Sequence, residues 1–465
     1  MLKKSVLKKL KSILGAKNLL TDEADLLCYS YDASTISVVP DAVALPTDKK
    51  QISEILLIAQ QEHIPIVARG AGTATTGSAV PVKGGLVICV SKMNQIKKIS
   101  STNLLAEVEP GVITKDIQTE VEKYGLFYPP DPASLKFCTI GGNVSTCAGG
   151  PSGVKYGVTK DYVLGLEVVL PNSKIINLGV KTAKGVVGYD LTKLFVGSEG
   201  TLGIITSIYL KLIPKPSYIK TIVSVFSNIN LACDAITCIL TSGIRPKCAE
   251  LIDHLSLCCI KEQLPFSVPS EARALILIEV DGSDPQGTEF EAQLIKSCCK
   301  SNRALLSYIA QNKTETQKLW QARRGLSPAL KRFGFPHKIS EDICVPRSNI
   351  SDMVTIVHSL AKKYNILSLV FGHAGDGNLH VNLLLNKHDK TQFKNAKKFI
   401  YELMETTLSL EGTISGEHGV GLTKKSFIKK ELGDDIIKLM YKIKKEVDPN
   451  NIMNPGKLFP GEFTV

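Results

Sequence analysis

The sequence lacks several patterns that would assign it to a class at once. None of its 12 cysteines forms a Cys-x-x-Cys pair, and only Cys258-Cys259 and Cys298-Cys299 are adjacent. Iron–sulfur clusters need closely spaced thiolates, so the chain carries no recognisable electron relay of its own. Because no export signal accompanies the cysteines, we expect reduced, buried thiols rather than disulfides.

Long apolar runs are also missing. No run approaches the roughly 18 apolar residues that indicate a transmembrane helix. The lysine-rich start lacks the unbroken apolar core of a secretory signal, and its apolar residues recur with a helical period. We therefore expect a cytoplasmic protein whose N-terminal helix packs on the body of the molecule. The alternative is a basic helix on a membrane surface, which limits any membrane contact to a peripheral one at the inner face.

The positive charge does not follow a nucleic-acid-binding pattern. The formal net charge is +12, and the lysines are spread along the chain without interleaved aromatic residues. No internal repeat, low-complexity tract or nucleic-acid-binding motif occurs. We expect no nucleic-acid partner, and a positive surface is compatible with attraction of small anionic substrates.

The length and the element pattern predict an α+β protein of several domains. At 465 residues the chain is too long for one core. Alternating strands and helices are predicted from residue 42 to residue 135 and further strands from residue 164 to residue 212, and Ile213-Pro-Lys-Pro216 predicts a boundary. Strands are then predicted at 221–225, 249–253, 274–280 and 338–345, with helices at 229–241, 285–301, 313–333 and 348–363. The predicted domains are an N-terminal helical segment 1–38, a first domain 39–216, a second domain 217–440 and a segment 441–465 that returns to the first domain.

Two short segments concentrate histidine and acidic residues. One segment places His373 and His380 on either side of Gly375-Asp-Gly-Asn378, a run of turn-forming residues. A strand, a tight turn and a return strand would place the two imidazoles side by side. The other segment, Gly416-Glu-His-Gly419, adds a carboxylate and a third imidazole. Two imidazoles and a carboxylate leave a metal open to substrate, although the sequence alone does not establish that the two segments meet.

The first half is rich in glycine loops. Residues 68–77, Ala-Arg-Gly-Ala-Gly-Thr-Ala-Thr-Thr-Gly, follow a predicted strand, but Thr75 breaks the nucleotide-binding pattern G-x-G-x-x-G and no Gly-Lys-Ser/Thr follows. Further loops combine glycine, proline and hydroxyl residues at 129–134, 139–143, 149–153 and 197–203. Clustered backbone N–H groups and hydroxyls can cradle a pyrophosphate, so the pattern favours a dinucleotide threaded between loops.

These motifs carry a family resemblance that extends from about Tyr29 to Phe459. The sequence resembles the FAD-linked oxidases of the vanillyl-alcohol oxidase (PCMH-type) superfamily, and within them the FAD-binding subunit of glycolate oxidase and the D-lactate and D-2-hydroxyglutarate dehydrogenases. The resemblance implies a two-part α/β FAD-binding domain of the PCMH type and an α+β substrate, or cap, domain with an antiparallel sheet. The matching motifs are Arg69-Gly-Ala-Gly-Thr73, Asp131-Pro-Ala-Ser134, Ile140-Gly-Gly-Asn143, Lys155-Tyr-Gly157, Glu199-Gly-Thr-Leu-Gly203, His373-Ala-Gly-Asp-Gly-Asn-Leu-His380, Gly416-Glu-His-Gly419 and Asn454-Pro-Gly-Lys457.

The resemblance implies that the first domain binds FAD, with the pyrophosphate on the 69–76 loop and the 139–143 turn. Some relatives attach the flavin through a histidine just after the paired glycines, where this chain has Thr73, so the flavin is expected to be non-covalent. The residues expected to bind FAD are Arg69, Gly70, Ala71, Gly72, Thr73, Thr76, Asp131, Ser134, Thr139, Gly141, Gly142, Asn143, Gly149, Gly153, Tyr156, Glu199, Gly203, Ile204 and Asn454.

The resemblance also assigns roles in the second half of the chain. The metal is expected to be Zn2+, Mn2+ or Fe2+, because nitrogen and oxygen ligands suit all three ions. His373, His380 and Glu417 match the family's metal ligands, and His418 matches its catalytic base. Arg323 matches the clamp for the substrate carboxylate, and Ser327, Lys338 and Asn382 match further positions of the substrate site.

These roles predict oxidation of a small D-2-hydroxy acid, glycolate or D-lactate, to the 2-oxo acid. The metal would acidify the hydroxyl, His418 would take its proton, and the C2 hydrogen would leave as hydride to flavin N5. The electrons would pass to an external acceptor, which is a quinone, an electron-transfer flavoprotein or an iron–sulfur subunit. Alternatives are D-2-hydroxyglutarate as substrate, activity only within a multi-subunit glycolate oxidase, a flavin-dependent alkyl transferase and a flavin-free metal hydrolase.

Overall fold

The chain divides into two compact units, and the computed structural model describes residues 2–461. The first unit comprises Met1–Gly149, Val158–Lys215 and Glu417–Val465, and the second comprises Gly150–Gly157 and Pro216–Gly416. The crossing at Pro216 coincides with the proline-rich boundary in the sequence. The last segment of the first unit begins at Glu417, and Gly150–Gly157 belongs to the second unit.

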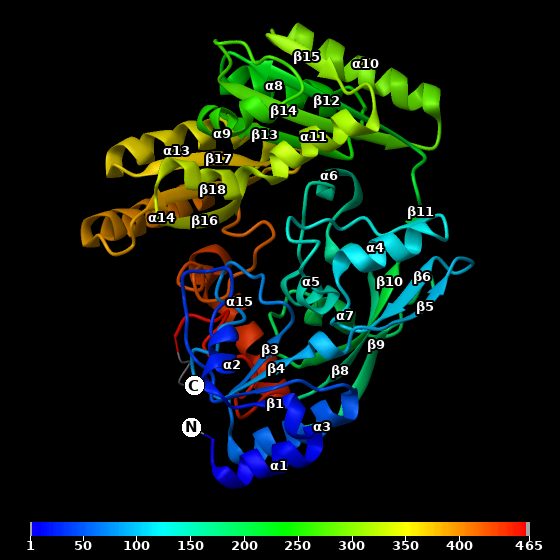
Figure 1. Cartoon of the computed structure of the whole chain (residues 1–465), viewed down its shortest axis with the longest axis vertical. Helices are drawn as coiled ribbons and strands as arrows, with labels where there is room; N and C mark the ends of the chain where they lie inside the picture. Colours follow the sequence, from blue (N-terminus) through cyan, green and yellow to red (C-terminus); the bar gives the residue numbers. More distant parts are fainter. Residues whose placement is uncertain (1, 462–465) are drawn as a thin grey trace. The chain divides into compact units, whose positions relative to one another are not determined.

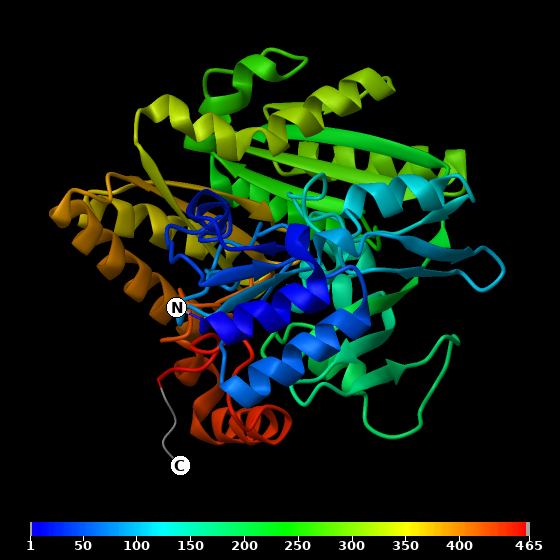
Figure 2. The same cartoon turned by 60° about the horizontal axis from the view of Figure 1, so that its bottom comes forward.

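A four-stranded sheet forms the N-terminal part of the first unit (Figure 1). Strands β2, β4 and β3 run parallel, and β1 is antiparallel to β2. Helices α1 and α3 lie side by side (Figure 2) and share a core with this sheet. Val6, Leu10 and Leu14 of α1 enter that core, which confirms the predicted packing of the N-terminal helix. The elements are α1 (Lys4–Leu14), β1 (Leu19–Leu20), α2 (Glu23–Cys28), β2 (Ala42–Ala44), α3 (Lys49–Glu62), β3 (Ile66–Arg69) and β4 (Leu86–Cys89).

A five-stranded antiparallel sheet forms the other part of the first unit, with the strand order β5-β6-β10-β8-β9. The loops that connect its elements contain most of the glycine-rich motifs. The strands are β5 (Ile96–Ser100), β6 (Leu105–Val108), β8 (Val163–Val169), β9 (Ile175–Gly179) and β10 (Ile204–Lys211), and a separate pair consists of β7 (Leu126–Phe127) and β11 (Ile213–Pro214). The helices are α4 (Thr114–Glu122), α5 (Ile140–Thr146), α7 (Leu191–Phe195) and, from the C-terminal return, α15 (Ile428–Val447).

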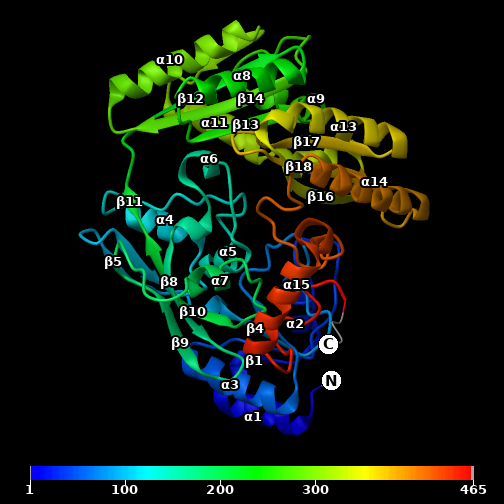
Figure 3. The same ribbon diagram turned by 180° about the vertical axis from the view of Figure 1, so that it is seen from behind.

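The second unit is built on a seven-stranded antiparallel sheet with the order β15-β12-β14-β13-β17-β18-β16. Helices α8, α10, α13 and α14 cover one face (Figure 3), and α9, α11 and α12 share a core with the other face. The strands are β12 (Tyr218–Phe226), β13 (Cys248–Asp253), β14 (Ala274–Gly282), β15 (Leu306–Ile309), β16 (His337–Cys344), β17 (Leu367–His373) and β18 (Asn378–Leu385). The helices are α6 (Gly153–Tyr156), α8 (Ile229–Thr241), α9 (His254–Ile260), α10 (Pro285–Ser301), α11 (Lys313–Arg324), α12 (Leu326–Ala329), α13 (Ile350–Tyr364) and α14 (Lys390–Ser409).

One predicted helix is wrong in its extent. The pattern predicts a single helix over 313–333, whereas the structure has α11 ending at Arg324, the short α12 and a 3-10 turn over Leu330–Phe333. Pro328 explains the break, because proline has no N–H to donate to the Arg324 carbonyl and its ring collides with that group. Within residues 2–461, no helix combines the length and the hydropathy that crossing a membrane requires.

Candidate functional site

A cavity in the first unit is lined by the glycine-rich loops. Loop 69–75 follows strand β3, residues 139–143 form the N-cap and the start of helix α5, and Glu199 and Gly200 precede strand β10. Val90, Ile204 and Ile205 contribute apolar surface. The predicted FAD-binding residues that line the cavity are Arg69, Gly70, Ala71, Gly72, Thr73, Ser134, Thr139, Gly141, Gly142, Asn143, Gly149, Glu199 and Ile204.

Parts of the cavity wall are formed by backbone rather than by side chains. A Cβ atom on Gly70 would lie 2.2 Å from Thr139 Oγ1, and one on Gly141 would lie 2.6 Å from Pro110 Cβ. Thr75 Oγ1 is buried in the wall and has no hydrogen-bond partner in the described part of the chain. A buried hydroxyl without a partner costs free energy, so the wall offers a polar group to a ligand. These features fit the phosphate-bearing dinucleotide that the motifs predict.

Some predicted FAD-binding residues lie outside the cavity lining. Tyr156 belongs to the second unit, where its hydroxyl donates to Asp281 Oδ2 at 2.8 Å. Asn454 Nδ2 donates to the backbone carbonyls of Ser78 and Glu199, so it braces two cavity loops. The full set outside the lining is Thr76, Asp131, Gly153, Tyr156, Gly203 and Asn454.

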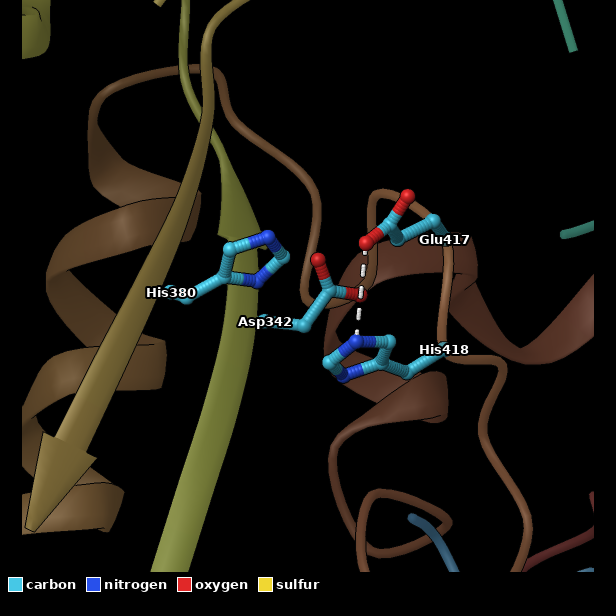
Figure 4. A group of neighbouring side chains, drawn as sticks. All are labelled: Asp342, His380, Glu417 and His418. Carbon is cyan, nitrogen blue, oxygen red and sulfur yellow. Dashed lines mark ion pairs between the residues drawn. The ribbon is translucent and has the colours of Figure 1, made fainter. Parts of the chain in front are cut away.

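Glu417 and His418 line the same cavity. His418 Nε2 lies 3.6 Å from Glu417 Oε1, as the dashed line in Figure 4 marks. A Cβ atom on Gly149 would lie 2.8 Å from Glu417 Oε2, so the carboxylate sits directly against the Gly149 backbone. The predicted base and the predicted FAD-binding loops therefore meet within one unit.

The histidine hairpin of the second unit forms as the sequence predicts. Strands β17 and β18 are antiparallel, with His373 opposite Asn378 and His380 opposite Phe371. The rings of His373 and His380 have centroids 5.0 Å apart, and their Nε2 atoms are 3.3 Å apart. The expectation that the turn places the two imidazoles side by side is confirmed.

Glu250 on β13 is the main residue that the sequence analysis missed in this region. Its side chain is fully buried, and the two carboxylate oxygens lie 2.6 Å from His373 Nδ1 and 2.6 Å from Arg323 Nε. Burial alone would raise the pKa of Glu250, but Arg323 and His373 outweigh it and hold that pKa below its ordinary value. The signal in the sequence is a lone carboxylate inside the apolar strand Ala249-Glu-Leu-Ile252.

The predicted carboxylate clamp is held by this pairing. Arg323 on α11 is buried, and its guanidinium carbon lies 4.8 Å from the centroid of the Phe371 ring. A guanidinium has five N–H donors, so the pairing with Glu250 leaves donors for a substrate carboxylate. Arg323 therefore fits the predicted role, with its orientation set by Glu250.

The remaining predicted substrate residues lie on or over the same strands. Lys338 Nζ on β16 donates to Ser327 Oγ on α12, and burial lowers the pKa of Lys338. Asn382 on β18 is fully buried and accepts from Ser340 Oγ at 3.0 Å. Because directly opposed residues share a face of an antiparallel sheet, the strand register places Glu250 with His373, Asp342 with His380, and Ser340 with Asn382.

Asp342 on β16 is a second carboxylate that the sequence analysis missed. It is fully buried, and Figure 4 shows it beside His380. A carboxylate oxygen of Asp342 and a ring nitrogen of His380 lie within 4.8 Å of each other. Ser415 Oγ donates to Asp342 Oδ2 at 2.9 Å, which fixes the carboxylate.

The histidine pair fits a divalent metal. Two nitrogen ligands of one tetrahedral ion lie about 3.3–3.4 Å apart when each metal–nitrogen bond is about 2.0–2.1 Å. The Nε2 atoms of His373 and His380 are 3.3 Å apart. Metal-bound histidines usually donate their other ring N–H to a carboxylate, and Glu250 provides that acceptor for His373 Nδ1.

The sequence matches two family models and several curated proteins. Residues 40–179 match the FAD binding domain model, and residues 215–458 match the model of the C-terminal domain of FAD linked oxidases. The glycolate oxidase subunit GlcD of Bacillus subtilis is 44% identical over 99% of this chain and 97% of its own length. The mitochondrial cytochrome D-lactate dehydrogenase of Arabidopsis thaliana is 32% identical over 98% of this chain and 80% of its own length.

The fold matches solved structures at low sequence identity. p-Cresol methylhydroxylase with bound substrate superposes with a TM-score of 0.81 at 19% identity, over 99% of this chain and 98% of that chain. Alkyldihydroxyacetonephosphate synthase superposes with a TM-score of 0.78 at 19% identity, over 98% of this chain and 85% of that chain. These likenesses establish the PCMH-type α+β fold that the motifs predict.

Proposed function

Because the chain belongs to the FAD-linked oxidases, we propose that it oxidises a small D-2-hydroxy acid, glycolate or D-lactate, to the 2-oxo acid. The observation that carries this proposal is the shared cavity, in which His418 and Glu417 stand among the FAD-binding loops. Curated relatives named glycolate oxidase subunit and D-lactate dehydrogenase support the substrate class. An enzyme of this class needs a base beside its flavin, and His418, which lines the cavity, is proposed for that role.

FAD, when bound in the cavity, supplies the acceptor for the hydride that leaves C2. The flavin is proposed to be non-covalent, because Thr73 stands where some relatives carry an attaching histidine. The pyrophosphate is proposed to lie on the 69–76 loop and residues 139–143, parts of which line the cavity. Loss of all flavin colour from the protein after acid precipitation would support a non-covalent link.

A divalent metal, when held by His373, His380 and Glu417, supplies a Lewis acid for the substrate hydroxyl. Glu417 is proposed as the third ligand on the family resemblance and on chain connectivity. It directly follows Gly416, and a Cβ atom on Gly416 would lie 3.3 Å from Asp342 Oδ1 on the strand beside His380. Zn2+, Mn2+ and Fe2+ all suit such a ligand set.

The chain's own residues bind the substrate and move one proton. Arg323 provides a fixed, planar cation for the carboxylate of the 2-hydroxy acid. Lys338 and Asn382 add polar contacts on the same sheet face. An imidazole nitrogen of His418 accepts the hydroxyl proton as the C2 hydrogen leaves with its electron pair. The products are the 2-oxo acid, a protonated His418 and the two-electron-reduced cofactor.

The two electrons are proposed to leave through an external acceptor. The 12 cysteines form no Cys-x-x-Cys motif, so no iron–sulfur relay is expected in this chain. The acceptor is a quinone, an electron-transfer flavoprotein or an iron–sulfur subunit. The word subunit in the relatives' names favours activity within a complex as the second candidate. Dye-linked turnover by the purified chain alone would decide between an independent dehydrogenase and a subunit, and a screen with D-2-hydroxyglutarate tests the longer substrate.

Replacement of His418 tests the proposed chemistry. In His418→Ala, FAD and metal contents should match the wild type, whereas anaerobic flavin reduction by D-lactate or glycolate should slow by roughly 100-fold or more, as expected for loss of a general base. Stopped-flow loss of the oxidised flavin absorbance measures the rate. Exposed His388, replaced by alanine, serves as the control and should reduce at the wild-type rate. Wild-type bleaching in His418→Ala would remove His418 from the reaction.

A further inference from the structure

Glu199 is a buried carboxylate in an unusual backbone conformation at the cavity wall. It lines the cavity and is 5% exposed. Its φ angle is +51°, in the left-handed region that non-glycine residues rarely adopt. Such a conformation costs free energy and persists only where surrounding contacts enforce it. The contacts of Glu199 therefore indicate the role of this residue.

The carboxylate of Glu199 binds the turn that follows His418. Glu199 Oε1 accepts from the backbone N–H of Val420 at 2.6 Å, and Oε2 accepts from that of Gly421 at 2.8 Å. A Cβ atom on Gly419 would lie 2.8 Å from Glu199 Oε1, so the turn needs glycine at this position. Both carboxylate oxygens are thus engaged by the two residues that lie just beyond His418-Gly419.

Thr76 binds the same turn from the 69–77 loop. Its backbone carbonyl accepts from Leu422 N at 2.8 Å, and its hydroxyl lies 3.5 Å from the His418 carbonyl oxygen. A Cβ atom on Gly421 would lie 2.5 Å from that Thr76 carbonyl oxygen. The segment 418–422 is therefore held between two loops, and both loops contribute lining to the predicted FAD cavity.

The backbone of Glu199 is fixed as well. Asn454 Nδ2 donates to the Glu199 carbonyl at 2.6 Å and to the Ser78 carbonyl at 3.0 Å. Lys457 Nζ in turn donates to Asn454 Oδ1 at 2.8 Å. The Asn454-Pro-Gly-Lys457 motif thereby connects the two cavity loops, and Glu199 cannot shift without breaking these hydrogen bonds.

We propose that Glu199 is a positioning residue for His418. Through Glu199, the positions of the cavity loops determine the position of the His418 imidazole. This inference rests on the proposed function in taking His418 as the base. Glu199 sets the backbone after His418 through two charge-assisted hydrogen bonds, and the side chain of His418 is placed in the cavity as a result. Binding of FAD to the loops then stiffens the same contacts.

Hydrogen–deuterium exchange tests the contact without turnover. In Glu199→Gln the amide side chain can accept through one oxygen only, so the backbone amides of Val420 and Gly421 should exchange roughly ten times faster than in the wild type, as expected for loss of a charge-assisted hydrogen bond. FAD added to the wild-type apoprotein should slow their exchange. Glu167→Gln is the control, because Glu167 is a buried carboxylate of the same unit that pairs with Lys49 and does not line the cavity. Unchanged exchange in Glu199→Gln would overturn the proposal.

A double-mutant cycle tests whether Glu199 acts through His418. Glu199→Gln alone should lower the rate of flavin reduction by roughly 10–100-fold, whereas Glu199→Gln in the His418→Ala background should add no further loss. Both rates are compared at saturating FAD, so that a higher Kd for FAD in Glu199→Gln does not count as an effect on His418. If Glu199→Gln lowers the rate of flavin reduction by the same factor in the wild-type and His418→Ala backgrounds, the proposal is overturned.

A second variant keeps the proposal testable if Glu199→Gln does not fold. Gly419→Ala places a methyl group against Glu199 Oε1 from the opposite side and should give the same faster exchange and the same non-additivity with His418→Ala. If no 2-hydroxy acid reduces the wild-type flavin, the proposed function fails. The exchange of Val420 and Gly421 still decides the role of Glu199 in that case.

Discussion

At the scale of single residues, the buried carboxylate of Glu250 joins two parts of the site that the sequence presents separately. One oxygen lies 2.6 Å from Nδ1 of the predicted ligand His373, and the other lies 2.6 Å from Nε of the predicted clamp Arg323. Because Nδ1 of His373 is engaged, Nε2 is the nitrogen that can bind a metal. A shift of Glu250 would therefore disturb the proposed metal site and the proposed carboxylate clamp together.

Replacement of Glu250 by glutamine should weaken the proposed metal site and the proposed carboxylate clamp at once. Loss of the carboxylate removes the charged partner of Arg323 and the anionic acceptor for His373, and removal of such an outer contact typically lowers metal affinity by roughly 10–100-fold. The KM for the 2-hydroxy acid should rise in parallel. Titration of the metal-free protein with Zn2+ or Mn2+ measures the first effect, and steady-state kinetics at saturating metal measure the second.

The matched control is Glu279→Gln. Glu279 is also a buried carboxylate of the same sheet, with a pKa that burial would raise but that Lys247 and hydrogen bonds from Trp320 and Thr221 hold below its ordinary value. Its partners include neither histidine of the pair. A loss of metal affinity in Glu279→Gln equal to that in Glu250→Gln would show that both act through general stability of the sheet.

The sequence predicts only part of this residue-scale arrangement. His373 and His380 are predictable because they bracket a turn, so their proximity follows from local chain geometry. Glu250 and Asp342 come from strands β13 and β16, which are remote in sequence. Their positions depend on the strand order and the register of the sheet, and no periodicity within a strand reveals which strand lies beside it.

At the scale of elements, the β17–β18 hairpin depends on glycine at its turn. Gly377 has φ +89°, and a Cβ atom there would lie 2.1 Å from the Val345 carbonyl oxygen. Gly377→Ala should therefore combine backbone strain, about 1–2 kcal/mol for a left-handed alanine, with a collision that backbone atoms cannot relieve cheaply. We expect a lower melting temperature and weaker metal binding, because His373 and His380 flank this turn.

Gly243→Ala separates the two contributions to that loss. Gly243 lies in the same unit and also has a positive φ, +85°, but a Cβ atom there would meet nothing within 4 Å. It should lower the melting temperature by the strain alone and leave metal affinity unchanged. If both variants lose the same stability in thermal unfolding, the collision with Val345 does not matter and the hairpin tolerates a side chain.

Helices show where sequence patterns suffice and where they fail. The predicted ranges of α8 and α10 agree with the structure because capping residues, Asn228 and Asp284, stand directly before them. The predicted helix 313–333 fails because its apolar periodicity continues across Pro328, whose missing N–H ends α11 at Arg324. The break has a consequence for the site, since it places Ser327 within reach of Lys338.

At the scale of the whole molecule, the sequence predicts the two-unit plan better than the path of the chain between the units. The proline-rich run predicts the crossing at Pro216 because two prolines end regular structure there. No proline marks the return at Glu417, and the glycines around it belong to the turn that contains His418. The contacts of the C-terminal motif with Ser78, Val80 and Glu199 join residues more than 200 positions apart in the chain, which local patterns do not encode.

Lys457 should make the stability that these long-range contacts provide depend measurably on pH. It is 2% exposed and donates to the Val80 carbonyl at 2.6 Å. Burial lowers the pKa of Lys457 to about 8, although the nearby carboxylates of Glu199 and Asp32 act to raise it. The pKa of lysine in an unfolded chain is about 10.4. Between these values the unfolded chain binds more protons than the native one, so the free energy of unfolding contributed by Lys457 rises with pH.

Lys457→Met, which cannot titrate, should reveal that rise by comparison with the wild type. The difference in the free energy of unfolding, wild type minus variant, should be flat below pH 8 and should increase toward pH 10.5 by up to roughly 3 kcal/mol. Urea unfolding followed by circular dichroism across this range measures it. Lys429→Met at an exposed lysine, 60% accessible in its side chain, should show no such increase. Parallel curves for the wild type and Lys457→Met would mean that Lys457 keeps its ordinary pKa, and the buried amine would then carry its charge throughout.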